Sequence, residues 1–72
     1  MRPTIRICII DDEPPCRDAL RIFLQTDCPE VEIIGEAGSL KAAANLLQKA
    51  CPDVIMLDVD LSDGTGFGLL NL

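Results

Sequence analysis

The feature that most constrains this chain is a short apolar run that stops at an acidic residue. The run covers residues 54–57, with Pro52 shortly before it and Asp58 directly after it. It is too short for a typical helix, and an uninterrupted run of this length is typical of a strand covered on both faces. An ionised carboxylate at the end of such a strand is costly unless an opposite charge meets it. The run therefore predicts a buried strand that brings Asp58 to a charged site.

A strand and a helix are predicted near the start of the chain. Residues 4–10 are mostly β-branched and almost entirely apolar after Arg6, which favours a first strand. Pro14 and Pro15 suit the first turn of a helix, where their missing N–H groups are no loss, and this helix should end near Thr26. One apolar stripe recurs along it at helical spacing: Cys16, Ala19, Leu20, Phe23 and Leu24.

A second strand of different character is predicted at residues 31–37. Glu32 and Glu36 would share one side of this strand, while Val31 and Ile33 would share the other. Such alternation is typical of a strand with one solvated face. We therefore expect this strand at the edge of a sheet.

A second helix follows, and the order of elements indicates the fold class. Ser39 is the expected N-cap, and the apolar stripe of this helix is formed by Leu40, Ala43, Ala44, Leu47 and Ala50. Two near copies of one tetrapeptide, Cys28-Pro29-Glu30-Val31 and Cys51-Pro52-Asp53-Val54, join the helices to the strands after them. The order β-α-β-α-β predicts an α/β fold with a parallel sheet and right-handed crossovers. Residues from Gly66 onward resemble the first turn of a third helix.

Length and charge narrow the possible functions. The chain has 72 residues, enough for one small domain, and carries a net charge of −6, with six basic residues against twelve acidic ones. This balance argues against contact between this segment and a nucleic-acid backbone, and favours a cation site or a basic partner. The chain shows no signal peptide and no run of transmembrane length, so we expect a cytoplasmic protein without membrane contact.

The four cysteines do not indicate a zinc site or a disulfide framework. Cys8, Cys16, Cys28 and Cys51 show no paired spacing, and the chain contains no histidine. Cys8 lies in an apolar run and should pack as a small hydrophobic residue. We expect all four thiols to be reduced.

Two predicted strands end at acidic residues. Asp11 and Asp12 follow the first strand, and Asp58 follows the third. Parallel strands bring their carboxyl ends to one edge of a sheet, and neighbours lie about 4.8 Å apart, so the three carboxylates would converge. A divalent cation such as Mg²⁺ would relieve the repulsion between them. Such a site would attract phosphate through the metal, and Asp58 could act as a carboxylate nucleophile that forms an acyl phosphate.

These acidic motifs match a known family. Residues 9–13 (Ile-Ile-Asp-Asp-Glu), residues 56–58 (Met-Leu-Asp) and Gly66 together resemble the N-terminal part of a response-regulator receiver domain of two-component signalling. The resemblance covers all 72 residues, about three of the fold's five βα units. It implies a truncated doubly wound, flavodoxin-like sheet of strand order 2-1-3, with residues 1–72 as a single incomplete domain. Residues 11–15 (Asp-Asp-Glu-Pro-Pro) further resemble regulators whose receiver precedes a LytTR-type DNA-binding domain.

The resemblance also implies a role for each acidic residue. Asp58 would accept a phosphoryl group from a sensor histidine kinase, and the domain would be regulatory and not itself an enzyme. Asp12 would bind Mg²⁺ directly and Asp11 through water, while Asp60 would offer its backbone carbonyl to the metal.

The chain departs from the family pattern in ways that affect signalling. Leu61-Ser62 stands where the family often has Met-Pro. The family's hydroxyl residue after the fourth strand and lysine after the fifth have no counterpart, since Lys41 and Lys49 fall on the second helix. We therefore expect this segment not to be competent to signal alone. In the implied strand order the third strand is an apolar edge, so we expect self-association through residues 54–57.

Other interpretations of the acidic residues stay open. The sequence Asp58-Val-Asp60-Leu-Ser62 also resembles the nucleophile loop of haloacid dehalogenase-like phosphohydrolases, with Asp58 as nucleophile and Asp60 as general acid–base. That interpretation leaves Asp11 and Asp12 unexplained. A receiver-like assembly module that binds metal without taking up a phosphoryl group is a further alternative. A calcium loop of EF-hand type fits less well, because no Glu closes the loop.

Structural roles alone would also account for some of these residues. The acids at 11–13 could cap the first helix and complement its dipole. Asp60, Asp63 and Gly64 are typical turn formers.

Overall fold

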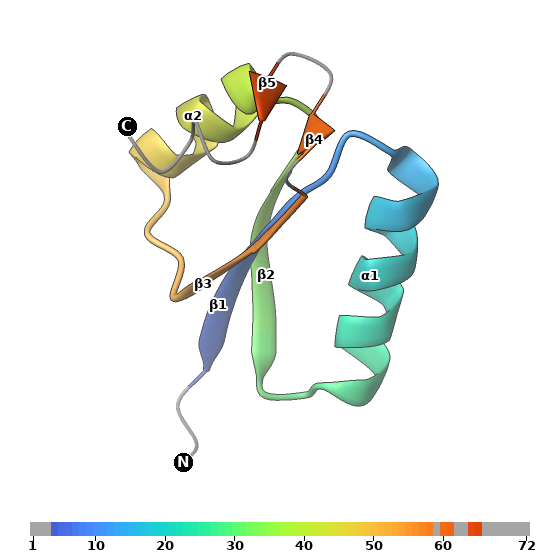
Figure 1. The fold of residues 1–72 in the computed structure, drawn as a ribbon. Coiled ribbons are helices and arrows are strands. Elements are labelled where there is room, and N and C mark those ends of the chain that lie inside the picture. Colours follow the sequence, from blue (N-terminus) through green and yellow to red (C-terminus); the bar gives the residue numbers. More distant parts are fainter. Residues whose placement is uncertain (1–3, 59, 62–63, 66–72) are drawn as a thin grey trace.

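The protein folds as a parallel sheet with one helix on each face, in a computed structural model that describes residues 4–58, 60–61 and 64–65 (Figure 1). The elements in chain order are β1 (Ile5–Ile10), α1 (Pro14–Asp27), β2 (Val31–Ala37), α2 (Leu40–Lys49), β3 (Val54–Leu57), β4 (Asp60–Leu61) and β5 (Gly64–Thr65). The predicted order β-α-β-α-β is confirmed, and β2 and β3 have the predicted bounds. The expected third helix, from Gly66 onward, lies outside the described residues.

Strand β1 lies between β2 and β3, and both pairings are parallel. The order β2-β1-β3 confirms the doubly wound topology. Ile10 is level with Ala37 on one side and with Leu57 on the other, so the three strands end together at one edge of the sheet. Backbone hydrogen bonds continue past these ends: Asp58 N donates to Ile10 O at 2.9 Å, and Asp11 N donates to Ala37 O at 3.1 Å.

The core is built around β1. Cys8, Ile9 and Ile10 are each 0% exposed. Because side chains alternate between the two faces of a strand, β1 contributes to two clusters. The cluster under α2 is centred on Ile10, Ala37 and Ala43. The cluster under α1 is centred on Ile7, Ile9 and Leu24. Burying an isoleucine side chain is worth about 1.5–3 kcal/mol, so this one strand supplies much of the stability of a small domain.

Strand β2 carries a bulge that reverses its side-chain pattern. Between Ile7 and Cys8 of β1, the register on β2 shifts by one residue. An extra residue on one strand sends the side chains after it to the opposite face. Glu36 therefore lies on the face covered by α1, and the prediction that it shares a side with Glu32 is wrong. The prediction that β2 is an edge strand is confirmed.

The inward face of α1 is rotated from the predicted apolar stripe. Leu24 is buried and Leu20 packs against the core beside it. Phe23, in contrast, is 47% exposed, and Cys16 and Ala19 are also exposed. These three members of the predicted apolar stripe therefore lie outside the buried face of the helix.

Two arginines on α1 explain the rotation. An oxygen of Glu36 lies 3.5 Å from Arg17 Nε, and both oxygens of Glu36 accept hydrogen bonds from Arg21 Nη1, at 3.0 and 3.1 Å. Positions four apart share a helix face, so the helix side that carries both arginines turns toward β2. Leu24 lies on that same side of the helix. The bulge in β2 places Glu36, the acidic partner of both arginines, within their reach.

Helix α2 follows the sequence prediction closely. It begins at the expected cap, where Ser39 Oγ accepts a hydrogen bond from Ala42 N at 3.0 Å. Ala43 is fully buried against the sheet. The approach is close at Gly35 of β2, where an added Cβ would lie 2.6 Å from Leu46 Cδ1. Neither α1 nor α2 has the length and apolar character that crossing a membrane would need.

Strand β3 is less covered than its apolar sequence predicts. Val54 is 42% exposed and Ile55 is 37% exposed, while Met56 and Leu57 are half-buried and pack against the two clusters. The prediction of a strand covered on both faces is therefore wrong for its first half. The reason is its position, because β3 is an edge of the three-stranded sheet.

The chain after β3 forms a small antiparallel pair. Asp60 of β4 pairs with Thr65 of β5, and Leu61 pairs with Gly64. Asp60 and Gly64, expected as turn formers, thus belong to a two-stranded ladder. Asp63 lies outside the described residues.

Candidate functional site

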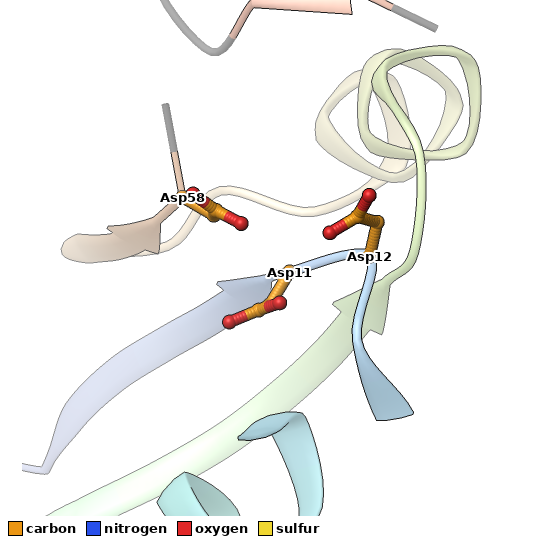
Figure 2. Close-up of side chains that lie close together, drawn as sticks. All are labelled: Asp11, Asp12 and Asp58. Carbon is orange, nitrogen blue, oxygen red and sulfur yellow. The ribbon is translucent and has the colours of Figure 1, made fainter. Parts of the chain in front are cut away.

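The strand ends place three aspartates at one edge of the sheet. Asp11 and Asp12 continue directly from β1, and Asp58 continues from β3. One carboxylate oxygen from each of the three lies within 4.8 Å of the others. Figure 2 shows the carboxylates of Asp12 and Asp58 pointing toward one another, with Asp11 beside them. The convergence expected from the parallel sheet is therefore present.

Electrostatics make this arrangement suitable for a cation. All three aspartates are half-buried, so water screens them less than it would on an open surface. Two like charges at about 4 Å repel by about 4 kcal/mol at an effective dielectric of 20. The ligands offered are hard carboxylate oxygens, which are the donors that Mg²⁺ and Ca²⁺ prefer. The donor set fits a hard divalent ion better than a soft one.

Asp11 also organises the turn between β1 and α1. Its Oδ1 accepts a hydrogen bond from Glu13 N at 2.9 Å, which closes a tight turn of the Asx type. Glu13 is the N-cap residue of α1, yet its side chain makes no capping hydrogen bond. The structure therefore gives no support to helix capping by a side chain as the reason for this acidic run.

A basic residue that sequence reasoning missed contacts this turn. Arg17 Nη1 donates a hydrogen bond to the backbone oxygen of Asp11 at 2.7 Å. The sequence signal was only a basic residue in the first turns of the helix that follows the acids. Its contact with Glu36 depends on the bulge in β2, which no local pattern indicated.

All four cysteines are free thiols, and two of them have raised pKa values. None of the four is in a disulfide, and Cys8 is buried as predicted. Burial raises the pKa of the Cys8 thiol. The negative charge of Glu13 raises the pKa of Cys16, with smaller contributions from Asp11 and Asp58. The exposed thiol of Cys16 therefore stays protonated where an ordinary thiol would begin to ionise.

A groove opens beside Asp11 and Asp58. Its volume is about 430 Å³. It is lined by Ile9, Ile10, Asp11, Leu20, Ile55, Met56, Leu57 and Asp58. The groove runs along β3, so the least covered strand of the sheet also leads to Asp58. Asp60, the remaining predicted site residue, lies in β4 just after this strand end.

Comparison with known proteins identifies relatives across almost the whole chain. The family model described as "Response regulator receiver domain" matches residues 7–72. The "Sensory transduction protein LytT" of Bacillus anthracis is 41% identical over 68 residues, which cover 94% of this chain and 27% of that protein. The "Transcriptional regulatory protein BtsR" of Escherichia coli (strain K12) is 34% identical over 68 residues, covering 94% of this chain and 28% of that protein.

Other similarities extend the comparison to a different kind of protein and to a solved structure. A "Protein-glutamate methylesterase/protein-glutamine glutaminase 3" of Rhodopseudomonas palustris (strain BisB18) is 41% identical over 69 residues, covering 93% of this chain and 19% of that protein. The crystal structure of a two-component response regulator of the LuxR family, from Aurantimonas sp. SI85-9A1, superposes with a TM-score of 0.82 at 29% identity. That alignment covers 92% of this chain and 46% of the other. The chain thus spans between about a fifth and about a half of the proteins named here, and the phosphohydrolase and assembly-module alternatives gain no support from them.

Proposed function

The chain belongs to the response regulator receiver domain family, a family of regulatory domains, and from this premise we propose that Asp58 is a phosphoryl acceptor that is loaded by a sensor histidine kinase. The observation that carries the proposal is the convergence of Asp11, Asp12 and Asp58 within 4.8 Å at the carboxyl edge of a parallel sheet. Asp58 follows directly after β3, and its N–H donates to Ile10 O at 2.9 Å, so the sheet holds the backbone of the proposed acceptor in place. The receiver region would lie in residues 1–72, as part of a longer domain.

The metal centre proposed here uses the three aspartates and one backbone group. Asp12 would bind Mg²⁺ directly, Asp11 through water, and Asp58 through the carboxylate oxygen that does not react. The backbone carbonyl of Asp60 would complete the set of protein ligands. When bound, the ion would neutralise the clustered carboxylates and draw in the oxygens of a phosphoryl group.

The transfer itself exchanges one bond to phosphorus for another. A carboxylate oxygen of Asp58 would form a bond to the phosphorus while the P–N bond to the kinase histidine breaks. The bonding pair of that P–N bond returns to the imidazole, which leaves as a neutral ring or takes a proton from solvent. The product on this chain is an acyl phosphate, so no oxidant or further co-reactant is needed.

Mass spectrometry after incubation with acetyl phosphate and Mg²⁺ tests the proposal. The wild-type chain should gain the mass of one phosphoryl group, and Asp58→Asn should gain none. Asp53→Asn is a matched control, because Asp53 precedes the same strand at its opposite end, where its carboxylate accepts a hydrogen bond from Arg6 N at 2.9 Å. Uptake by Asp58→Asn equal to that of the wild type would contradict the assignment.

We also propose that the whole protein is a cytoplasmic transcription regulator with a LytTR-type DNA-binding domain. The similarity to proteins named LytT and BtsR supports this proposal. The net charge of −6 argues against contact between this segment and the DNA backbone. DNA binding would therefore fall to a separate output domain. The relative named as a methylesterase is the main competitor, since its receiver region is equally similar. Footprinting of the full-length protein on its own upstream DNA would separate the two.

The exposed side of β3 supports a second interaction, between two copies of this chain. Val54 and Ile55 are both more than a third exposed on an edge strand, and such edges pair with other strands. We propose that a second copy covers β3 by edge pairing. Light scattering over a concentration series tests this, and a monomer at high concentration would overturn it.

A further inference from the structure

One side chain ties the acidic turn to the rest of the fold. Arg17 Nη1 donates to Asp11 O at 2.7 Å, and its Nε lies 3.5 Å from an oxygen of Glu36. The Arg17 and Glu36 side chains are only 23% and 24% exposed. The guanidinium therefore joins three parts of the molecule, namely α1, the end of β1 and the end of β2.

The space for this guanidinium is built into the turn after β2. A Cβ added at Gly38 would lie 2.9 Å from Arg17 Nη1, closer than real Cβ atoms approach such an atom. Its nearest backbone neighbour would be Asp11 O, at 3.9 Å. The absence of a side chain at Gly38 thus leaves the position in which Arg17 reaches Asp11.

The bond to Asp11 O acts on Asp12 through the peptide plane. The carbonyl of Asp11 and the Cα of Asp12 belong to the same planar unit, which rotates as one body. A donor held on that oxygen therefore restrains the orientation of this peptide unit and the position of the Asp12 Cα, from which the side chain starts. Arginine is suited to this task, because its planar fork can reach two acceptors at once while lysine offers a single point of charge.

Arg21 offers a natural comparison on the same helix face. It shares Glu36 with Arg17, through bonds of 3.0 and 3.1 Å, and its other hydrogen bond goes to Asp18 at 2.7 Å. Among the described residues its hydrogen bonds go to these two acids and not to Asp11. The two arginines thus share charge, helix and partner, and differ in the contact with the acidic turn.

We propose that Arg17 is a positioning residue for the metal centre, which holds the Asp11–Asp12 peptide in the orientation that lets Asp12 face Asp58. The inference rests on the proposed Mg²⁺ site. The positioning role and simple electrostatics predict opposite changes in Mg²⁺ affinity when the charge of Arg17 is removed. Removing a positive charge near a cation site should strengthen cation binding by Coulomb's law, whereas losing a positioning contact should weaken it.

Calorimetric titration of the full chain with Mg²⁺ tests the proposal on four proteins: wild type, Arg17→Gln, Arg17→Lys and Arg21→Gln. Both Arg17 variants should bind Mg²⁺ about 10-fold more weakly, as is usual when an outer partner of a metal ligand is removed. Arg21→Gln should bind as the wild type does. Full affinity in Arg17→Lys would show that charge alone matters, and tighter binding by Arg17→Gln would show that repulsion dominates. Either result overturns the proposal.

A spectroscopic reading separates positioning from general destabilisation. In the metal-free protein, the carbonyl carbon resonance of Asp11 reports the hydrogen bond to its oxygen, and the amide nitrogen of Asp12 reports the same peptide unit. Both resonances should move in Arg17→Gln and stay in place in Arg21→Gln. Equal movement in the two variants would overturn the inference.

Two further outcomes keep the test decisive. If Arg17→Gln does not fold, Gly38→Ala replaces it, because the added methyl displaces the guanidinium and leaves the arginine in the chain. Gly38→Ala should then weaken Mg²⁺ binding, and unchanged affinity would overturn the inference. If the wild type binds no Mg²⁺, the proposed metal centre itself fails. Intact wild-type binding with no effect of Arg17 rejects only the positioning role.

Discussion

The two edges of the sheet, β2 and β3, begin alike and end differently. Each is entered through the same kind of tetrapeptide, Cys-Pro-acid-Val, and each entry is tied to β1 by a backbone hydrogen bond of 2.8 Å. Both helices pack against β2, which also carries the bulge and the acidic partner of two arginines. In β3, Val54 and Ile55 are more than a third exposed, and Asp58 follows directly after the strand. The local tetrapeptide therefore determines how each strand begins, whereas contacts between segments distant in the sequence determine which side chains of the strand are covered.

This difference assigns separate tasks to the two edges. On the β2 edge, Glu36 makes polar contacts with two arginines of α1, and one of them, Arg17, also donates to Asp11 O in the turn after β1. On the β3 edge, Val54 and Ile55 leave an exposed apolar surface on the strand that ends at Asp58, the proposed acceptor. Strand β1 lies between them and serves both, since its side chains fill the clusters on either face of the sheet.

The largest effect should come from the strand that both edges share. Ile9 is 0% exposed and packs with residues of α1 and of both neighbouring strands. Ile9→Ala should lower the free energy of unfolding by about 2–5 kcal/mol, because it removes buried contacts and leaves a cavity. Urea unfolding followed by circular dichroism measures this. Ile5→Ala is the control, since Ile5 on the same strand is 39% exposed and should lose much less. Equal losses at the two positions would show that the described burial is wrong.

The next effect tests the polar closure of the β2 edge. Glu36→Gln should lower the free energy of unfolding by about 1 kcal/mol, because a partly screened contact to two arginines loses its charge. Glu32→Gln, at an exposed position of the same strand, should change it by less than about 0.5 kcal/mol. Thermal unfolding at low and high salt measures both. A loss in Glu36→Gln that persists unchanged in high salt would contradict an electrostatic origin.

The same comparison explains what could be predicted from the sequence. The apolar run at β3, the cap at Ser39 and the acids after β1 are local signals, and each prediction from them is confirmed in position. Parallel pairing then brings Asp11, Asp12 and Asp58 together without further information. The convergence of the site thus followed from topology alone.

The parts that could not be predicted depend on the bulge in β2. A bulge reverses the side-chain pattern after it, and no residue type in this strand required one. Glu36 was therefore assigned to the wrong face, and its contact with Arg17 and Arg21 was not foreseen. The stripe on α1 was then misplaced, because apolar periodicity alone put Phe23 in the core although the helix turns its arginines inward.

The open β3 edge gives a smaller effect on stability and a clear effect on association. Ile55→Lys places a charge on an edge side chain that is already 37% exposed. The free energy of unfolding should fall by about 1 kcal/mol or less, while self-association should be lost because a lysine blocks edge pairing. Sedimentation velocity over a concentration range measures the association. The matched variant Glu32→Lys on the β2 edge should leave association as it is, and loss of association in both would point to net charge as the cause.

The smallest predicted effect concerns the reactivity of Cys16, whose pKa is raised in part by the negative charge of Asp58 at the end of β3. Glu13 is the main cause of the raised pKa of Cys16, and Asp58 contributes least. A raised pKa means less thiolate at a given pH, so iodoacetamide should modify Cys16 faster in Glu13→Gln than in the wild type at pH 8. Asp58→Asn should speed the reaction by a smaller amount, and the exposed Cys51 should react at the same rate in all three proteins. Peptide mapping of the modified cysteines measures each rate. If Asp58→Asn left Cys16 unchanged while Glu13→Gln accelerated it, the field at this thiol would come from the turn after β1 alone, with no contribution from the β3 end.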